Sequence, residues 1–202
     1  MRTVPTCAAI CSLSIAALAS ADVYVFDNSV TYSAFCNDLG VVRESESLAS
    51  FSTGSYASLT GGSGDFAWSL SAPSGLWVDA ATTTARTQQN TEKLSLNFSS
   101  ANVYAVGGFF FNLDSSSTVK SGVMKIKLSD GTSFIRTVSN MTTFSGFVSD
   151  GANITSVEVS HAGTLGSQYF VATSGFNIGV VPAPGALALV GLAGLVARRR
   201  RA

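Results

Sequence analysis

The sequence has few charged residues, a single histidine and no hydrophobic run long enough for an ordinary membrane span. Charged residues form 12% of the 202 residues, about half the share usual in globular proteins. Phosphate binding needs clustered Lys and Arg, and the central part of the chain has no such cluster. Since His161 is the only histidine and no G-x-S-x-G motif occurs, we expect neither an enzyme nor a nucleic-acid-binding protein.

Cysteine is also scarce. Cys7 and Cys11 lie near the start of the chain, and Cys36 is the only other cysteine. Cys36 on its own forms no intramolecular disulfide, so it is either a small buried side chain or an intermolecular thiol. Asn112 and Asp114 supply two oxygen ligands, whereas calcium takes six to eight. We therefore expect no metal site and no cofactor.

The zero net charge hides an uneven distribution. All twelve acidic residues lie between Asp22 and Val181, together with seven of the twelve basic ones, which gives this part a net charge of −5. The other five basic residues are Arg2 and Arg198–Arg201, at the two ends of the chain. Positive charge that flanks an apolar segment tends to stay in the cytoplasm, so the terminal arginines indicate membrane topology signals.

Residues 1–21 have the three parts of a secretory signal peptide. Arg2 provides the basic start, an apolar stretch runs from Cys7 to about Leu18, and Ala19-Ser20-Ala21 fits the A-x-A cleavage pattern. With Ala19 and Ala21 as the cleavage signal, we expect the mature chain to begin near Asp22. An uncleaved anchor helix is the alternative.

Residues 181–202 form a second terminal signal. Val181-Pro182-Ala183-Pro184 precedes an apolar run over residues 185–197, and Arg198-Arg199-Arg200-Arg201 follows as a basic stop signal. The run is shorter than the roughly 20 residues of an ordinary membrane helix. This order of parts resembles the PEP-CTERM sorting signal, with Ala183 in place of the central Glu of that motif.

The resemblance implies recognition by an exosortase, a membrane cysteine transpeptidase, and cleavage at or near Pro182–Pro184. The expected partners are this enzyme, the secretion machinery and, transiently through the 185–197 helix, the inner membrane. The protein would then reach the outer surface or the extracellular matrix. A permanent C-terminal tail anchor is the alternative.

Residues 22–180 show short alternating apolar runs separated by turn residues, with no extended helical period. Leu94, Leu96 and Phe98 should share one face of a strand, and Asp130-Gly131 should supply the positive φ angles of a hairpin turn. Residues 43–50 fit a short helix or a loop. The expected strands are 23–26, 65–70, 75–80, 94–98, 103–111, 124–128, 134–138, 144–148, 154–159, 168–173 and 176–180.

This spacing predicts an all-β domain, an antiparallel β-sandwich that is jelly-roll-like. The run 94–161 also resembles a recurrent body of PEP-CTERM and related exported proteins. The matching residues are Gly107–Phe111, Asp130-Gly131, Phe144–Phe147 and Val157-Glu158-Val159. That resemblance implies a jelly-roll-like sandwich and no particular activity.

Two functions remain open. We expect a structural or interaction role at the cell surface. The alternative is a carbohydrate-binding module for extracellular polysaccharide, with Trp68 and Trp77 as candidate stacking platforms for sugar rings. The commoner place for such rings is a sandwich core.

Overall fold

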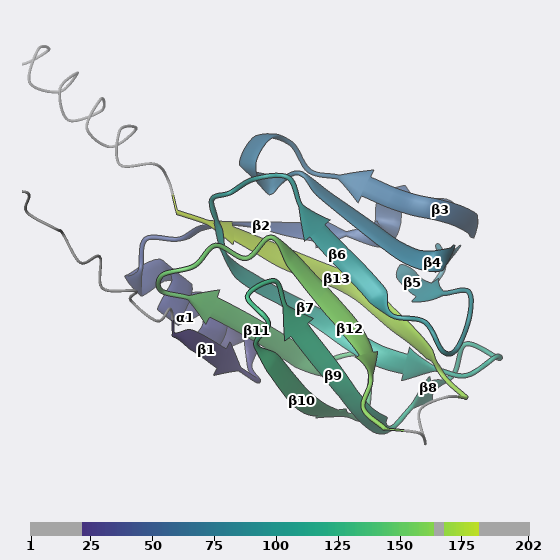
Figure 1. Cartoon of the computed structure of the whole chain (residues 1–202). Coiled ribbons are helices and arrows are strands. Elements are labelled where there is room, and N and C mark those ends of the chain that lie inside the picture. The colour runs from purple at the N-terminus through teal and green to yellow at the C-terminus, as the bar shows by residue number, and fades with distance from the viewer. Residues whose placement is uncertain (1–21, 164–167, 182–202) are drawn as a thin grey trace, which may run out of the picture.

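The computed structural model describes residues 22–163 and 168–181, which fold into one large β-sheet with a short helix (Figure 1). The elements in chain order are β1 (Val23–Phe26), α1 (Ser29–Asp38), β2 (Val42–Ser47), η1 (Leu48–Ser50), β3 (Gly54–Gly61), η2 (Gly64–Phe66), β4 (Trp68–Asp79), β5 (Thr84–Thr87), β6 (Leu94–Phe98), β7 (Val103–Leu113), β8 (Val119–Lys120), β9 (Gly122–Leu128), β10 (Ser133–Val138), β11 (Phe144–Ser149), β12 (Ser156–His161) and β13 (Phe170–Val180).

The strands form a curled sheet in the order β1-β11-β7-β13-β5-β4-β6-β12-β9-β10. Strands β2, β3 and β8 pair with β13, β4 and β7, and every pair described is antiparallel. The curl brings β10, at one end of this order, close to β11 near the other end. Arg136 Nη2 of β10 donates to the Phe144 carbonyl of β11 at 2.8 Å, and the rings of Phe134 and Phe147 lie 5.0 Å apart. The all-β prediction is thus confirmed.

The inner face of the curl holds the main hydrophobic core. Leu94, Leu96 and Phe98 are buried there, as their alternation predicts, and so are Val157 and Val159 of the neighbouring strand. The core also joins strands that are not direct neighbours, since Trp68 of β4 packs edge-on against Phe176 of β13, two places away in the strand order. Side chains on the inner face of the curled sheet therefore pack against one another and form the core.

The outer face of β7, β11 and β13 is covered at two places. Helix α1 lays Tyr32 and Cys36 over Ala105, Phe144 and Val148. Further along the strands, a second small cluster forms where Val119 and Met141 pack on three buried residues. These are Phe111, Leu113 and Ala172.

Glycines allow a close approach of aromatic rings to the sheet beneath α1. Gly107 pairs with Gly146 across β7 and β11, beneath the rings that α1 and β11 supply. A Cβ atom would lie 2.6 Å from Phe144 Cζ at Gly107, and 2.7 Å from Tyr32 Cδ2 at Gly146. Since these contacts are too short for a Cβ, glycine lets the aromatic rings lie directly on the sheet.

Several sequence predictions need correction. Helix α1 was not expected. The segment 43–50, expected as a helix or loop, is mostly strand β2 followed by η1. Of the expected strands 65–70 and 75–80, residues 68–70 and 75–79 belong to one strand, β4, in which Pro73 lies where the register with β3 shifts. Asp65 and Phe66 lie in η2 instead. The last two expected strands are likewise one strand, β13, with an irregularity between Thr173 and Gly175.

The β9–β10 turn differs from the expected one. Gly131 has a φ of 92°, whereas Asp130 is not among the residues with positive φ. The Asp130 carboxylate instead accepts hydrogen bonds from the Thr132 backbone N–H and hydroxyl, each at 2.8 Å. A turn with a single left-handed glycine needs positive φ at one position only.

Candidate functional site

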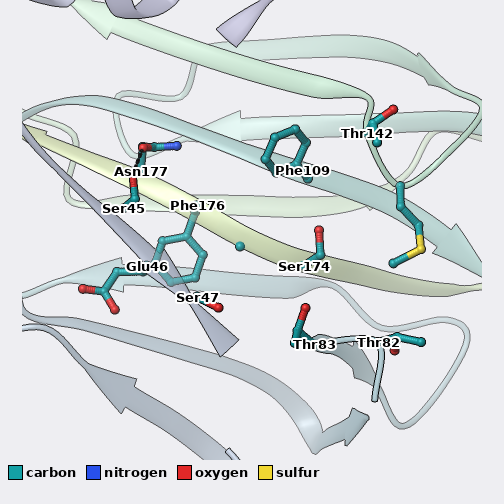
Figure 2. Close-up of a pocket in the computed structure, with 12 residues that line it drawn as sticks. Ser45, Glu46, Ser47, Thr82, Thr83, Phe109, Thr142, Ser174, Phe176 and Asn177 are labelled. Carbon is teal, nitrogen blue, oxygen red and sulfur yellow. Dashed lines mark hydrogen bonds between the residues drawn. The ribbon is translucent and has the colours of Figure 1, made fainter. Parts of the chain in front are cut away.

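An open groove of about 430 Å³ lies on the outer face of the sheet (Figure 2). It forms where β13 changes its partner. Thr173 pairs with Ala85 of β5, whereas Gly175 pairs with Ser47 of β2, and the register with β7 shifts between them. Because β5 and β2 meet β13 from different parts of the chain, they leave a gap at this irregularity.

The groove lies between the two covered regions of the outer face. Phe109 lines it on the side of α1, where its ring packs 5.6 Å from that of Phe144. Met141 lines it on the side of the second cluster. The groove is thus the part of this face that neither α1 nor the turn before β11 covers.

Seven of the twelve residues that line the groove carry a hydroxyl or amide group. Ser45 and Asn177 are paired across β2 and β13, and Ser45 Oγ donates to Asn177 Oδ1 at 2.6 Å. The other groove residues are Glu46, Ser47, Thr82, Thr83, Phe109, Met141, Thr142, Ser174, Gly175 and Phe176. Hydroxyl groups both donate and accept, and the amide nitrogen of Asn177 supplies two further donors.

Glu46 does not bring its charge into this lining. It alternates with Ser45 and Ser47 along β2 and pairs with Phe176, whose side chain lies in the main core. Successive side chains of a strand point to opposite faces, so the Glu46 carboxylate lies on the face opposite to Ser45. In Figure 2 this carboxylate points away from Ser174 and Thr142. The groove therefore presents neutral polar groups beside an aromatic ring.

Two backbone features shape the groove. A Cβ at Gly175 would lie 2.9 Å from the Glu46 carbonyl oxygen, so glycine lets β2 approach β13 here. Thr83, in the turn between β4 and β5, has a φ of 52°. A β-branched residue with positive φ is an outlier, and such strain gathers at functional sites more often than elsewhere.

The two candidate tryptophans lie in different environments. Trp68 is 3% exposed in the main core, so its ring is not available to a sugar in solution. Trp77 is 37% exposed and pairs with Arg86 on the neighbouring strand. Arg86 places its guanidinium carbon 4.1 Å over the Phe170 ring, and burial lowers the pKa of Arg86. Trp77 is thus the one of the two whose position suits stacking.

Trp77 also lies near the groove. Asp79, two residues along the same strand, accepts a hydrogen bond from the groove residue Thr82 through Oδ2 at 3.0 Å. Residues two apart on a strand share a face and lie about 7 Å apart. Trp77 and the groove are therefore parts of one outer surface.

His161 lies at the end of β12, as its sequence position indicates. Its Nε2 lies 2.6 Å from the Tyr169 carbonyl oxygen, and burial lowers the pKa of the imidazole. It does not line the groove. No acid–base pair with a nucleophile is found among the groove residues, and the expectation of no enzymatic activity stays a prediction.

The Asn112 and Asp114 pair is not a common ligand set. Asn112 is 1% exposed within β7. The Asp114 carboxylate accepts from the backbone N–H of Thr118, pairs with Lys120 at 3.1 Å and accepts from the backbone N–H of Ser116. These contacts lower its pKa. Turn formation accounts for these contacts. Over 22–163 and 168–181, no three His, Cys, Asp or Glu side chains gather as a metal site would require.

Cys36 belongs to α1, and its side chain is fully buried between the helix and the sheet. This burial raises the pKa of its thiol. This position agrees with the interpretation as a small buried side chain. An intermolecular thiol needs access to a partner, which the packing around Cys36 prevents.

The terminal signals lie almost entirely outside the described residues. Ala19, Ala21, Pro182, Ala183, Pro184 and Arg198–Arg201 are all outside them. Val181 is the last residue described, 38% exposed, and its N–H donates to the Asn102 carbonyl at 3.2 Å. A search of the described residues for helices able to cross a membrane found none.

The two ends of the described chain leave the sheet at the same end. Tyr24, Val148, Ala105 and Gly179 are successive partners across β1, β11, β7 and β13. The start of β1 and the end of β13 therefore lie on one row of four adjacent strands, at the left of Figure 1. Any N-terminal leader and C-terminal tail are attached at this side.

Comparison of the chain with protein-family models gave no match, and comparison with curated proteins gave no significant one. The groove residues are not singled out as a site by the sequence analysis. The available signal was the interruption by Ser174-Gly175 between two apolar runs, which marks the irregularity in β13.

Proposed function

We propose that this protein is an exported component of the cell surface or extracellular matrix with a structural or interaction role. An exosortase sorts and cleaves it at Val181-Pro182-Ala183-Pro184. The observation that carries the proposal is where the last described strand ends relative to this motif. Strand β13 ends at Val180, and Val181 is already partly exposed. Cleavage after this point would leave every strand of the sheet intact.

The distribution of charge supports the same route. The described domain carries excess negative charge, while the basic residues Arg198–Arg201 lie beyond the apolar run. Positive residues next to an apolar helix remain in the cytoplasm. The domain would then face the periplasm while the tail is still in the inner membrane, transiently, with the secretion machinery and exosortase as partners.

We also propose that the curled sheet is a jelly-roll-like β-sandwich. Its support is the contact between the two ends of the strand order, where the rings of Phe134 in β10 and Phe147 in β11 lie 5.0 Å apart. Such a domain serves as a stable module between two signals that are removed.

The experiment compares hosts with and without an exosortase. The full chain should lose its tail and reach the outer or extracellular fraction only in the first host. Substituting Pro182 and Pro184 by Ala should keep the tail and leave the protein in the inner membrane. Pro73→Ala, a change of the same type within β4, should leave processing unchanged. Release that is equal in both hosts would contradict the proposal.

The groove favours a second candidate function, the binding of neutral polysaccharide. Its neutral hydroxyl and amide lining beside Phe109 suits sugar hydroxyls and an apolar ring face, and Trp77 extends the same surface. Asn177→Ala and Trp77→Ala should each reduce retention on a neutral polysaccharide column. Asn97→Ala, an exposed residue of β6 outside the groove, is the matched control. Equal retention of all variants would exclude this function for the groove.

A further inference from the structure

A second hollow lies where the two ends of the sheet approach each other. It is a cavity of about 160 Å³ between β1 and β11 on one side and β9 and β10 on the other. Its apolar wall comes from Val25, Phe26, Ile126, Phe134, Ile135 and Phe147. Val25 is 47% exposed and marks where the cavity opens to solvent.

Two polar groups in this apolar cavity have no partner. Ser145 is 2% exposed, and its Oγ makes no hydrogen bond. The Nε–H of Arg136 is likewise buried without an acceptor. Both residues line the cavity, and neither donor has a hydrogen-bond partner in the protein.

The positive charge of Arg136 also has no counter-ion within the described part of the chain. Its Nη2 donates to two backbone carbonyls, of Phe144 at 2.8 Å and Asp27 at 3.4 Å. The ion pairs found there are Lys93–Glu158 and Lys120–Asp114, and Arg136 is in neither. The two carbonyl contacts fix the guanidinium at the cavity and leave its charge uncompensated.

These features define the ligand chemistry. A buried donor without an acceptor is unfavourable, and an unpaired guanidinium forms its strongest hydrogen bonds with a carboxylate. The apolar wall matches a compact hydrocarbon group rather than a fully polar anion. An apolar cavity of about 150 Å³ accommodates a single benzene ring, so the space fits one ring or a short branched chain.

We propose that this cavity is a binding site for a small carboxylic acid with a compact apolar group. The carboxylate accepts from Arg136 Nε–H and Ser145 Oγ–H, and the apolar group lies among Val25, Ile126, Phe134 and Phe147. The site is distinct from the outer groove, because it opens between the two ends of the sheet. It stands whether or not the sorting proposal holds.

The test uses benzoate as the probe, measured by isothermal titration against the exported protein, with benzamide as the uncharged analogue of similar size. Benzoate should bind the wild type and benzamide at least about tenfold more weakly, since benzamide offers one neutral acceptor oxygen in place of a charged carboxylate. Ser145→Ala should weaken benzoate binding about tenfold, and Arg136→Gln by more. Lys125→Gln, an exposed change on neighbouring β9, is the control that should bind as the wild type does.

Three results would overturn the proposal. They are no benzoate binding at millimolar concentration, equal binding of benzoate and benzamide, and full binding by Ser145→Ala and Arg136→Gln. Near-UV circular dichroism checks that the variants are folded. If Arg136→Gln is not folded, Ser145→Ala decides, because it removes a single buried hydroxyl that bonds to nothing in the protein.

Discussion

Thr83 shows most directly how a single residue in the groove carries strain. Its φ of 52° places a β-branched side chain in the left-handed region, which costs a non-glycine residue roughly 1–2 kcal/mol. The residue lines the groove, and Thr82 beside it is held by Asp79. Neither the strain nor the position was visible in the sequence, since threonine is an ordinary strand residue.

Relief of this strain is measurable. Thr83→Gly should raise the free energy of unfolding by about 0.5–1 kcal/mol, because the relief exceeds the entropy that glycine loses on folding. Thr60→Gly in β3, the same substitution at an exposed strand position, should lower it by roughly 0.5–1 kcal/mol. Urea unfolding of both variants checks the prediction. Destabilisation by both would show that Thr83 is not strained.

The single histidine predicts a pH dependence. Burial lowers the pKa of His161 in the folded protein, although hydrogen bonds with the backbone of Tyr169 and Asn90 oppose this. The unfolded chain therefore takes up a proton at higher pH than the folded protein does. The contribution of His161 to stability is complete above about pH 6.5 and declines as the pH falls towards the lower folded-state pKa.

His161→Gln should remove this decline. Thermal unfolding of the wild type and the variant between pH 7.5 and about pH 5 tests the point, since most carboxylates titrate below this range. The wild type should lose stability relative to the variant as the pH falls. Parallel curves would show that His161 titrates alike in both states.

At the scale of elements, periodic segments were predictable and α1 was not. Leu94, Leu96 and Phe98 alternate with polar residues, so their strand and its buried face could be recognised from the sequence. Helix α1 buries mainly Tyr32 and Cys36, one helical turn apart, and has no extended apolar stripe. Its start was signalled only by Asn28, a preferred helix cap.

The cap provides an element-scale test. Asn28 Oδ1 accepts from the backbone N–H groups of Val30 at 2.7 Å and Thr31 at 3.4 Å. Asn28→Ala should lower the free energy of unfolding by about 1 kcal/mol, whereas Asn28→Asp, which keeps the acceptor, should stay close to the wild type. Chemical denaturation measures both. Equal loss in the two variants would show that the side-chain oxygen does not stabilise α1.

At the scale of the whole molecule, the order of the strands in the sheet could not be predicted from the sequence. Ser45 and Asn177, whose side chains bond in the groove, are 132 residues apart, and no local pattern records that pairing. The same applies to the cavity, where β1 and β11 face β9 and β10. The sequence could indicate strands and buried faces, because these follow from local alternation, but not which strands become neighbours.

The central claim is that the sheet between the two terminal segments is the mature protein. Asp22 already contributes to it, since its backbone N–H donates to Asp150 Oδ1 at 2.8 Å. Val181 closes the other end through its bond to Asn102. A chain cut at both ends would therefore retain all the strands of the sheet and both hollows.

The most direct test is the intact mass of the protein recovered from a host that carries an exosortase. The account predicts a chain that begins at Asp22, ends within Val181–Pro184, and is found in the outer or extracellular fraction. A mass that still includes Arg198–Arg201, found in the inner membrane, would contradict it and show a protein anchored by its tail.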